Sequence, residues 1–166
     1  MRKTILVGLL ALALPAAALA ADDTPSATDV ASAACKSERA QSGTKTFKAT
    51  YASSSTSAAM TACIEKRDGA AATNLKNAAK ACKAERAADP AAFTTKYGTN
   101  KNGRNAYGKC VSAKAREAAA QQTQARVNAA KACKKLKTEQ KVAFDQAYGT
   151  KKNAFAKCVS KMARGG

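Results

Sequence analysis

Helically spaced apolar positions recur along the chain, and one arrangement of features occurs three times. Three segments align on an Ala-Cys pair and read AACKSERA at 33–40, KACKAERA at 80–87 and KACKKLKT at 131–138. Each is followed by a Phe and, four residues on, a Tyr. A second Cys comes later, three residues after an apolar side chain. Since residues four apart share one helix face, the repetition predicts three helical repeat units.

Each unit has a candidate helix break between its first Cys and its Phe, which would bring its two cysteines together. Asp89-Pro90 has the form of an N-cap followed by proline at the first helical position, and Ser42-Gly43-Thr44 has the same place in the first unit. Thr138-Glu139-Gln140 is a weaker signal, so the third unit's helix is free to continue. Gly98 and Gly149 directly follow tyrosines, where a left-handed glycine is expected to end the helix.

The segments between the units are alanine-rich, and alanine is the strongest helix former. No Pro or Gly occurs from Lys109 to Tyr148, so a long helix is predicted there, while Asp68-Gly69 is expected to interrupt the equivalent link between the first two units. No strand-like alternation occurs. The predicted fold is all-α, a tandem array of three disulfide-closed helical units joined by long Ala-rich helices. The predicted units are 33–70 (degenerate), 71–118 and 119–166.

The N-terminus has the pattern of a secretory signal peptide, predicted over 1–20. Arg2 and Lys3 precede a short apolar run, and Ala18 and Ala20 occupy the small-residue positions of a cleavage site. The run is too short for a membrane span, which needs about 20 apolar residues. The protein is therefore expected to be secreted or extracytoplasmic after cleavage near Ala20, with 21–32 as a disordered acidic lead-in.

The high net charge and the small apolar core indicate that hydrophobic burial is not sufficient to stabilise the fold. The full sequence carries a formal charge of +18, which predicts attraction to polyanions and self-repulsion in the compact state. Beyond residue 20, Leu75 and Leu136 are the only leucines and Ile64 is the only isoleucine. Alanine buries little area, so apolar burial alone is not expected to offset the conformational entropy of the chain.

The six cysteines are the predicted source of the additional stability. An even number in an exported chain predicts a disulfide framework. Zinc sites use closely spaced cysteines or mixed Cys/His sets, and spacings of 28, 28 and 25 without any histidine argue against metal ligation. Fifteen connectivities are possible, and a repeated unit with its own two cysteines favours the pairs Cys35–Cys63, Cys82–Cys110 and Cys133–Cys158.

The sequence offers no constellation suited to catalysis. It contains no His and no Trp, its carboxylates do not recur as a pair placed for acid and base work, and no serine lies in a nucleophile context. Gly98, Gly103 and Gly108 do not form a phosphate loop after a strand. The protein is predicted to be non-enzymatic, with no catalytic residue, no cofactor, no metal and no small-molecule substrate.

The turns before the second cysteines contain the predicted functional residues. They place lysine and arginine at helix N-termini, whose free N–H groups and partial positive charge favour anions. The alternative is that these are solvated loop lysines. The third unit is also the most basic, through residues that include Lys131, Lys137, Lys161 and Arg164. The predicted anion-binding residues are Lys101, Arg104, Lys109, Lys151, Lys152 and Lys157.

The string YGTNKNGRNAYGKCVS, at 97–112, resembles a motif of uncharacterised secreted bacterial proteins of actinobacterial type, rich in Ala, Lys and paired Cys. The resemblance covers the second and third units well and the first poorly. It implies export and repeat character and adds no mechanism, since no activity is established for those proteins. The Ala/Lys bias is also similar in composition to histone-tail-like DNA-binding proteins.

Together these features favour a cationic helical repeat protein that binds anionic polymers through its basic turns. A wall polymer, phospholipid head groups or extracellular nucleic acid would each satisfy the charge. Three alternatives remain: a membrane-active cationic protein, a structural spacer or protein-interaction module with no polyanion ligand, and an intracellular DNA-binding protein. A membrane-active helix needs a continuous apolar face with bulky anchors, which alanine does not provide.

Overall fold

The protein is an elongated helical bundle. The computed structural model describes residues 24–165, and the predicted signal peptide lies outside this range. No strand occurs within it, and none of the helices found there is long and apolar enough to cross a membrane. The helices of the described chain are α1 (Ala27–Ser42), α2 (Thr44–Thr50), α3 (Thr56–Ala88), α4 (Pro90–Tyr97), α5 (Ala106–Glu139), α6 (Lys141–Tyr148) and α7 (Ala154–Met162).

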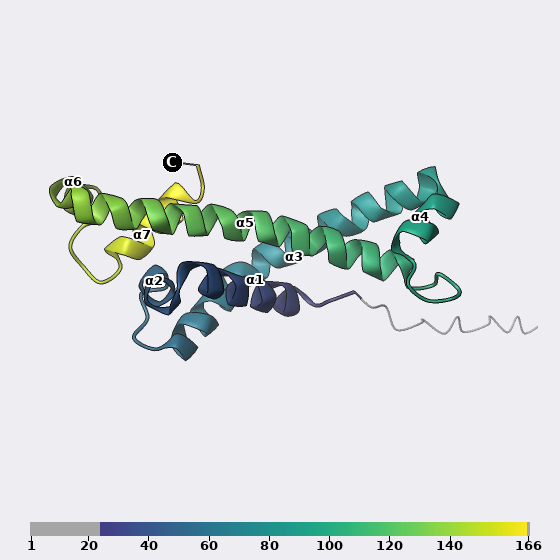
Figure 1. Ribbon diagram of the computed structural model, residues 1–166, viewed down its shortest axis with the longest axis horizontal. Helices are drawn as coiled ribbons and strands as arrows, with labels where there is room; N and C mark the ends of the chain where they lie inside the picture. The colour runs from purple at the N-terminus through teal and green to yellow at the C-terminus, as the bar shows by residue number, and fades with distance from the viewer. Residues whose placement is uncertain (1–23, 166) are drawn as a thin grey trace, which may run out of the picture.

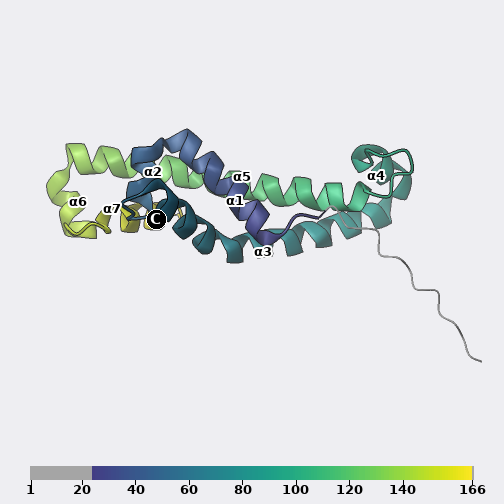
Figure 2. The same cartoon turned by 90° about the horizontal axis from the view of Figure 1, so that it is seen from below.

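Two long helices, α3 and α5, run side by side for much of the molecule, and α1 packs against both (Figures 1 and 2). The short helix α4 and the turn after it cap one end of the rod. Helices α2, α6 and α7 gather toward the opposite end, where α2 contacts α7. The tandem units thus fold back on one another, and α7 of the third unit meets α2 of the first.

The three predicted within-unit disulfides are confirmed. Cys35 pairs with Cys63, Cys82 with Cys110, and Cys133 with Cys158, each with a Cα–Cα distance of 6.0 Å. Each of the three core clusters of the described chain contains one of these disulfides, surrounded mainly by alanine, valine and an aromatic side chain. The bridges are therefore fully buried members of cores that have few large apolar residues.

The predicted breaks that fold each unit are present. Helix α1 ends before Gly43, and Asp89 caps α4 by accepting a hydrogen bond from the Ala92 amide, with Pro90 at the first helical position. The third unit also breaks, because α5 ends at Glu139 and α6 starts after Gln140. All three Phe/Tyr pairs lie on one helix face, with ring centroids 4.9, 5.0 and 5.2 Å apart.

Two boundary predictions are wrong. The disordered lead-in was expected to extend to residue 32, but α1 begins at Ala27 because Ser26 and Asp29 form a reciprocal capping box and Val30 is buried in the core. Asp68-Gly69 does not interrupt α3, which is continuous through both residues. Gly69 has open space around it, and packing of α3 against α1 and α5 outweighs its weak helix propensity.

The two glycines that follow tyrosines differ in conformation. Gly149 has a φ of 84°, as expected of a helix-ending glycine. Gly98 has a φ of −71°, so the left-handed prediction is wrong there. A side chain is excluded at Gly98 for another reason, because a Cβ atom would lie 2.6 Å from the Thr94 carbonyl oxygen. The turn after α4 folds tightly onto the last turn of that helix.

Ala52 occupies the equivalent position in the first unit and has a φ of 52°. This left-handed conformation costs a non-glycine residue about 1–2 kcal/mol. Ala52→Gly is expected to raise the free energy of unfolding by about 0.5–1 kcal/mol, after the greater freedom of glycine in the unfolded chain is subtracted. Urea unfolding measures the change. The control, Ala49→Gly in α2, should instead lower stability by about 1 kcal/mol, and equal effects at both sites would contradict the prediction.

Candidate functional site

The six predicted anion-binding residues fall into two groups at opposite ends of the rod (Figure 1). Lys101, Arg104 and Lys109 are exposed on or just after the turn between α4 and α5. Lys151, Lys152 and Lys157 are exposed around the turn between α6 and α7. The fold therefore keeps the two predicted turns far apart and does not combine them into one site.

The turn between α4 and α5 is held by its own polar side chains. Asn105 accepts a hydrogen bond from the Thr99 amide and donates one to the Thr99 hydroxyl, at 3.1 and 2.6 Å. Lys101, Arg104 and Lys109 extend from this frame without an ion pair within the described chain. They form an exposed basic turn.

The other group adjoins three neighbouring hollows, which we term together the basic groove. Its three segments have volumes of about 630, 510 and 450 Å³. The first two segments share Lys66, Ser160 and Arg164, and the second and third share Ala52. The basic side chains that line the groove are Lys48, Lys66, Arg67, Arg126, Lys152, Lys157, Lys161 and Arg164.

No acidic residue lines any of the three segments. This one-sided lining is the main chemical property of the groove, because eight basic side chains line it and the carboxylate of Glu38, which pairs with two of them, is not part of the lining. The groove is built from distant parts of the chain, since its walls come from α2 and the turn after it, from mid-α3, from mid-α5, from the end of α6, and from α7 with the turn before it. Contact between α2 and α7 brings these walls together.

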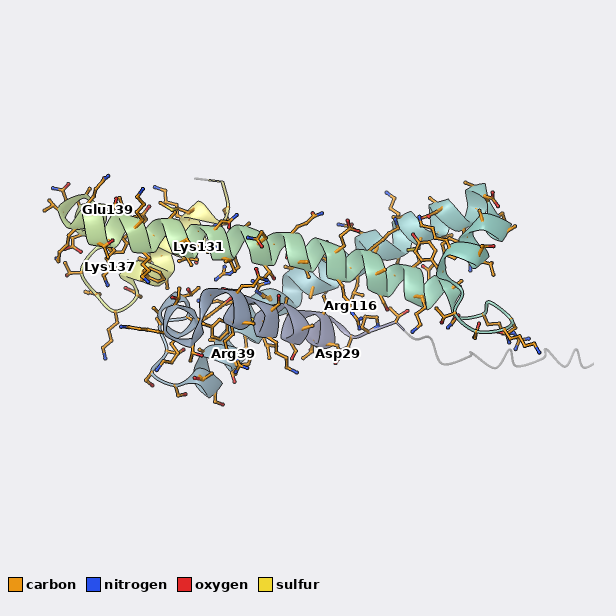
Figure 3. All side chains as sticks on the ribbon, in the orientation of Figure 1. Asp29, Arg39, Arg116, Lys131, Lys137 and Glu139 are labelled. Atoms are coloured by element: carbon orange, nitrogen blue, oxygen red, sulfur yellow. A yellow bond between two sulfur atoms is a disulfide. The ribbon has the colours of Figure 1, made fainter. Side chains whose placement is uncertain are left out.

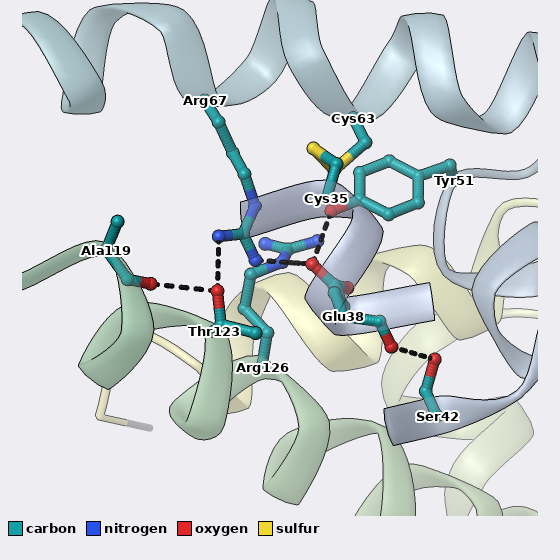
Figure 4. The surroundings of a disulfide bond; sticks show 9 residues. All are labelled: Cys35, Glu38, Ser42, Tyr51, Cys63, Arg67, Ala119, Thr123 and Arg126. Atoms are coloured by element: carbon teal, nitrogen blue, oxygen red, sulfur yellow. Dashed lines mark hydrogen bonds and ion pairs between the residues drawn. A yellow bond between two sulfur atoms is a disulfide. The ribbon is translucent and has the colours of Figure 1, made fainter. Parts of the chain in front are cut away.

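A buried ion cluster lies at the floor of the first segment (Figure 4). The Glu38 side chain, on α1, is only 2% exposed and pairs with the Arg67 guanidinium of α3. The Arg126 Nε of α5 lies 3.4 Å from the same carboxylate. The Tyr51 hydroxyl donates to Glu38 at 2.8 Å, and Arg67 donates to the Thr123 hydroxyl at 2.9 Å. The cluster joins α1, α3, α5 and the turn after α2.

The charges of this cluster do not balance. Two guanidinium groups share the single carboxylate of Glu38, which leaves one positive charge at the floor of the groove. Burial, followed by the nearby Glu38 charge, raises the pKa of the Tyr51 hydroxyl. That hydroxyl therefore stays protonated and remains a donor to the carboxylate. The Arg126 guanidinium also lies over the Tyr51 ring, 5.2 Å from its centroid.

The contact between tyrosine and glutamate recurs in the second unit and is absent from the third. Tyr97 donates to both carboxylate oxygens of Glu85 at 3.2 Å, and a hydrogen bond from Lys96 lowers the pKa of Glu85. The corresponding position in the third unit is Leu136, which packs, like Tyr148, against the core cluster around Cys133 and Cys158. Tyr148 lines the second groove segment, so its ring adds an aromatic surface to the wall.

Sequence reasoning identified part of the groove. Lys152 and Lys157 were predicted, and Lys161 and Arg164 belong to the unit expected to be most basic. Other basic residues of that unit lie elsewhere, since Lys131 and Lys137 project from α5 outside the groove (Figure 3). The groove residues not predicted are Lys48, Lys66, Arg67 and Arg126, with Glu38 beneath them.

Comparison with known proteins does not assign the site. No family model, no curated protein and no solved structure matches the chain. The fold and its groove define a class in physical terms, as an all-helical, disulfide-closed protein with a hollow cationic face. Function is therefore inferred from the geometry and charge of that face.

Proposed function

We propose that the protein is a non-enzymatic binding protein for linear anionic polymers, and that the basic groove is its main contact surface. The observation that carries this proposal is the lining of the groove, in which eight basic side chains occur without an acidic one. Such a surface attracts polyanions and releases their counterions on binding. The polymer carries phosphate or carboxylate groups along a flexible chain.

The shape of the site favours a linear chain over a membrane surface. The positive charges line three neighbouring hollows, which a single polymer chain can enter and a flat bilayer cannot. Each segment lies within the range of about 300–1,000 Å³ typical of ligand sites. The exposed turn with Lys101, Arg104 and Lys109 is a second, weaker contact in this proposal, since these side chains line none of the three groove segments.

The proposed compartment is extracytoplasmic, reached after cleavage of the signal peptide near Ala20. The disulfides support it, because every cysteine of the described chain is oxidised and such bonds persist in oxidising compartments. Anionic polymers of the cell envelope and extracellular nucleic acid are both accessible there. An N-terminus found at Ala21 in secreted protein would agree with this proposal, and protein retained in the cytoplasm would contradict it.

The test is binding to polyphosphate and to single-stranded DNA at several salt concentrations, followed by fluorescence anisotropy. If about five charges engage, affinity for the single strand is expected to fall on the order of 100-fold between 50 and 200 mM salt. Affinity that does not change with salt would overturn the proposal. Failure to bind either polymer would favour a spacer, and vesicle leakage without polymer binding would favour a membrane-active protein.

Matched charge reversals locate the contact surface. The groove variant Lys157→Glu, Lys161→Glu, Arg164→Glu is expected to lose most of the affinity. The turn variant Lys101→Glu, Arg104→Glu, Lys109→Glu changes the net charge equally and is expected to lose much less. Equal losses would mean that binding follows net charge alone, and a larger loss for the turn variant would place the main contact at the α4–α5 end.

A further inference from the structure

The first segment of the basic groove combines exposed and buried positive charge. Lys66 and Arg164 are exposed on its walls, whereas Arg67 and Arg126 are mostly buried at its floor, with side chains 8% and 19% exposed. Ser160 adds a hydroxyl to the lining. Four cations thus line a volume of about 630 Å³, and the Glu38 carboxylate beneath them is already shared by the two buried arginines.

The floor of this segment is incompletely neutralised. Glu38 offsets one of the two guanidinium charges; the Arg67 Nε is buried without a hydrogen-bond partner, and the buried Arg126 Nε approaches Glu38 at 3.4 Å without a hydrogen bond. An uncompensated charge in a partly buried site is costly, and an anion placed against it is bound more strongly there than at an exposed lysine. The first segment is therefore expected to favour the binding of one additional negative group.

The arginine side chains indicate which class of anion the first segment would bind. A guanidinium is more weakly hydrated than an ammonium and offers a planar fork of donors that matches phosphate and carboxylate oxygens. Two arginines at the floor, with Lys66, Arg164 and the Ser160 hydroxyl around them, present donors from several directions. A tetrahedral oxyanion uses such a surrounding set better than a planar carboxylate, because its oxygens point in more than one plane.

We propose that this segment is a discrete subsite for one phosphate group, bound by Arg126, Arg164 and Lys66 above the Glu38–Arg67 pair. The inference rests on the proposed function, in which it would hold one phosphate of a polymer chain. It adds a distinct claim, since a single inorganic phosphate should bind there without the polymer. The remaining groove cations would then contact neighbouring groups of the same chain.

The test uses the full oxidised chain, labelled with ¹⁵N, and inorganic phosphate as the probe. Phosphate is titrated against sodium chloride at constant ionic strength while the arginine Nε–H signals are followed by NMR. Saturable shifts are expected for Arg67 and Arg126, with one phosphate bound per chain. Shifts that grow linearly without saturating, or that chloride reproduces, would overturn the subsite.

Single substitutions of the residues that line the first segment provide a second test of the subsite. Arg126→Gln is expected to weaken phosphate binding about tenfold or more, as loss of a charged hydrogen-bond partner does. Arg164→Gln, at an exposed position outside the buried cluster, is expected to weaken it severalfold with unchanged melting temperature. The control is Lys137→Gln, on α5 outside the groove, which should leave phosphate binding unchanged. If Arg126→Gln does not fold, phosphate binding by Arg164→Gln and Lys66→Gln tests the proposal in its place. The proposal would be overturned if all of these variants bound phosphate as well as the control does.

Further titrations separate the subsite from the general function and identify the source of the phosphate. Salt-dependent binding of polyphosphate without saturable binding of inorganic phosphate would overturn the subsite and leave the proposed function standing. Saturable phosphate binding without any polymer binding would support the subsite and overturn the proposed function. Inorganic phosphate is expected to displace polyphosphate, and preferential displacement of the protein from phosphatidic acid vesicles would identify a lipid headgroup as the source.

Discussion

Complete reduction of the three disulfides is expected to unfold the protein at neutral pH and room temperature. Each bridge closes a loop with a sequence separation of 25 or 28 residues, worth about 3 kcal/mol on the chain-entropy account. Loss of all three removes on the order of 10 kcal/mol, and small domains have only about 5–15 kcal/mol in total. The alanine-rich clusters around the bridges are too small to compensate.

Circular dichroism at 222 nm, before and after reduction and alkylation, measures this effect. Oxidised protein carried through the same alkylation step is the control and should keep its helical signal. The double variant Cys133→Ala, Cys158→Ala is expected to loosen α6 and α7 first, because their core cluster is formed with the end of α5 alone. Retention of a cooperative thermal transition after complete reduction would contradict the prediction.

Most of the fold was predictable because its signals are local. Asp89-Pro90 and Gly43 mark the breaks, the Phe/Tyr pairs mark helix faces, and a repeat that carries two cysteines indicates its own pairing. The errors occurred where tertiary packing outweighs a local signal, as at Gly69 within α3. The assumed boundaries of the units at 70/71 and 118/119 also fall inside continuous helices, so the units share their connecting segments.

The basic groove was only partly predictable because it is made by contacts between distant units. The meeting of α2 with α7 places the turn of the first unit beside the last helix of the third, and no local pattern encodes that contact. A signal for the buried cluster was present, however. The buried positions of α3 recur every three or four residues and include Arg67 between Cys63 and Ala71. A charged residue on such a stripe must find a buried partner.

The buried pair also explains why the groove and the fold are coupled. The Cys35–Cys63 bridge lies beside Glu38 and Arg67 (Figure 4), so one region holds both a covalent and an ionic link between α1 and α3. Arg126 extends the ionic link to α5. A change at this point therefore alters the packing of α1, α3 and α5 as well as the charge of the groove floor.

Arg67→Ala is expected to be the most damaging single substitution outside the cysteines. It leaves the Glu38 carboxylate buried with Tyr51 and a more distant Arg126, and removal of one partner from a buried ion pair costs about 3–5 kcal/mol. The neighbouring control, Lys66→Ala, removes an exposed groove cation and should change stability by less than about 0.5 kcal/mol. Urea unfolding of the oxidised proteins measures both.

The double variant Glu38→Gln, Arg67→Met separates the cost of an unpaired charge from the loss of packing. It removes both charges of the Glu38–Arg67 pair while keeping similar side-chain volumes, and it leaves Arg126, which is 19% exposed and lines the groove, as the remaining charge of the cluster. Because that charge can be hydrated from the groove, the double variant is expected to be more stable than Arg67→Ala, with a coupling energy on the order of 1–3 kcal/mol relative to the separate changes. Additive effects would mean that the two side chains do not depend on each other. In that case the ion pair would not hold α1 to α3, and packing around the Cys35–Cys63 bridge would carry the contact alone.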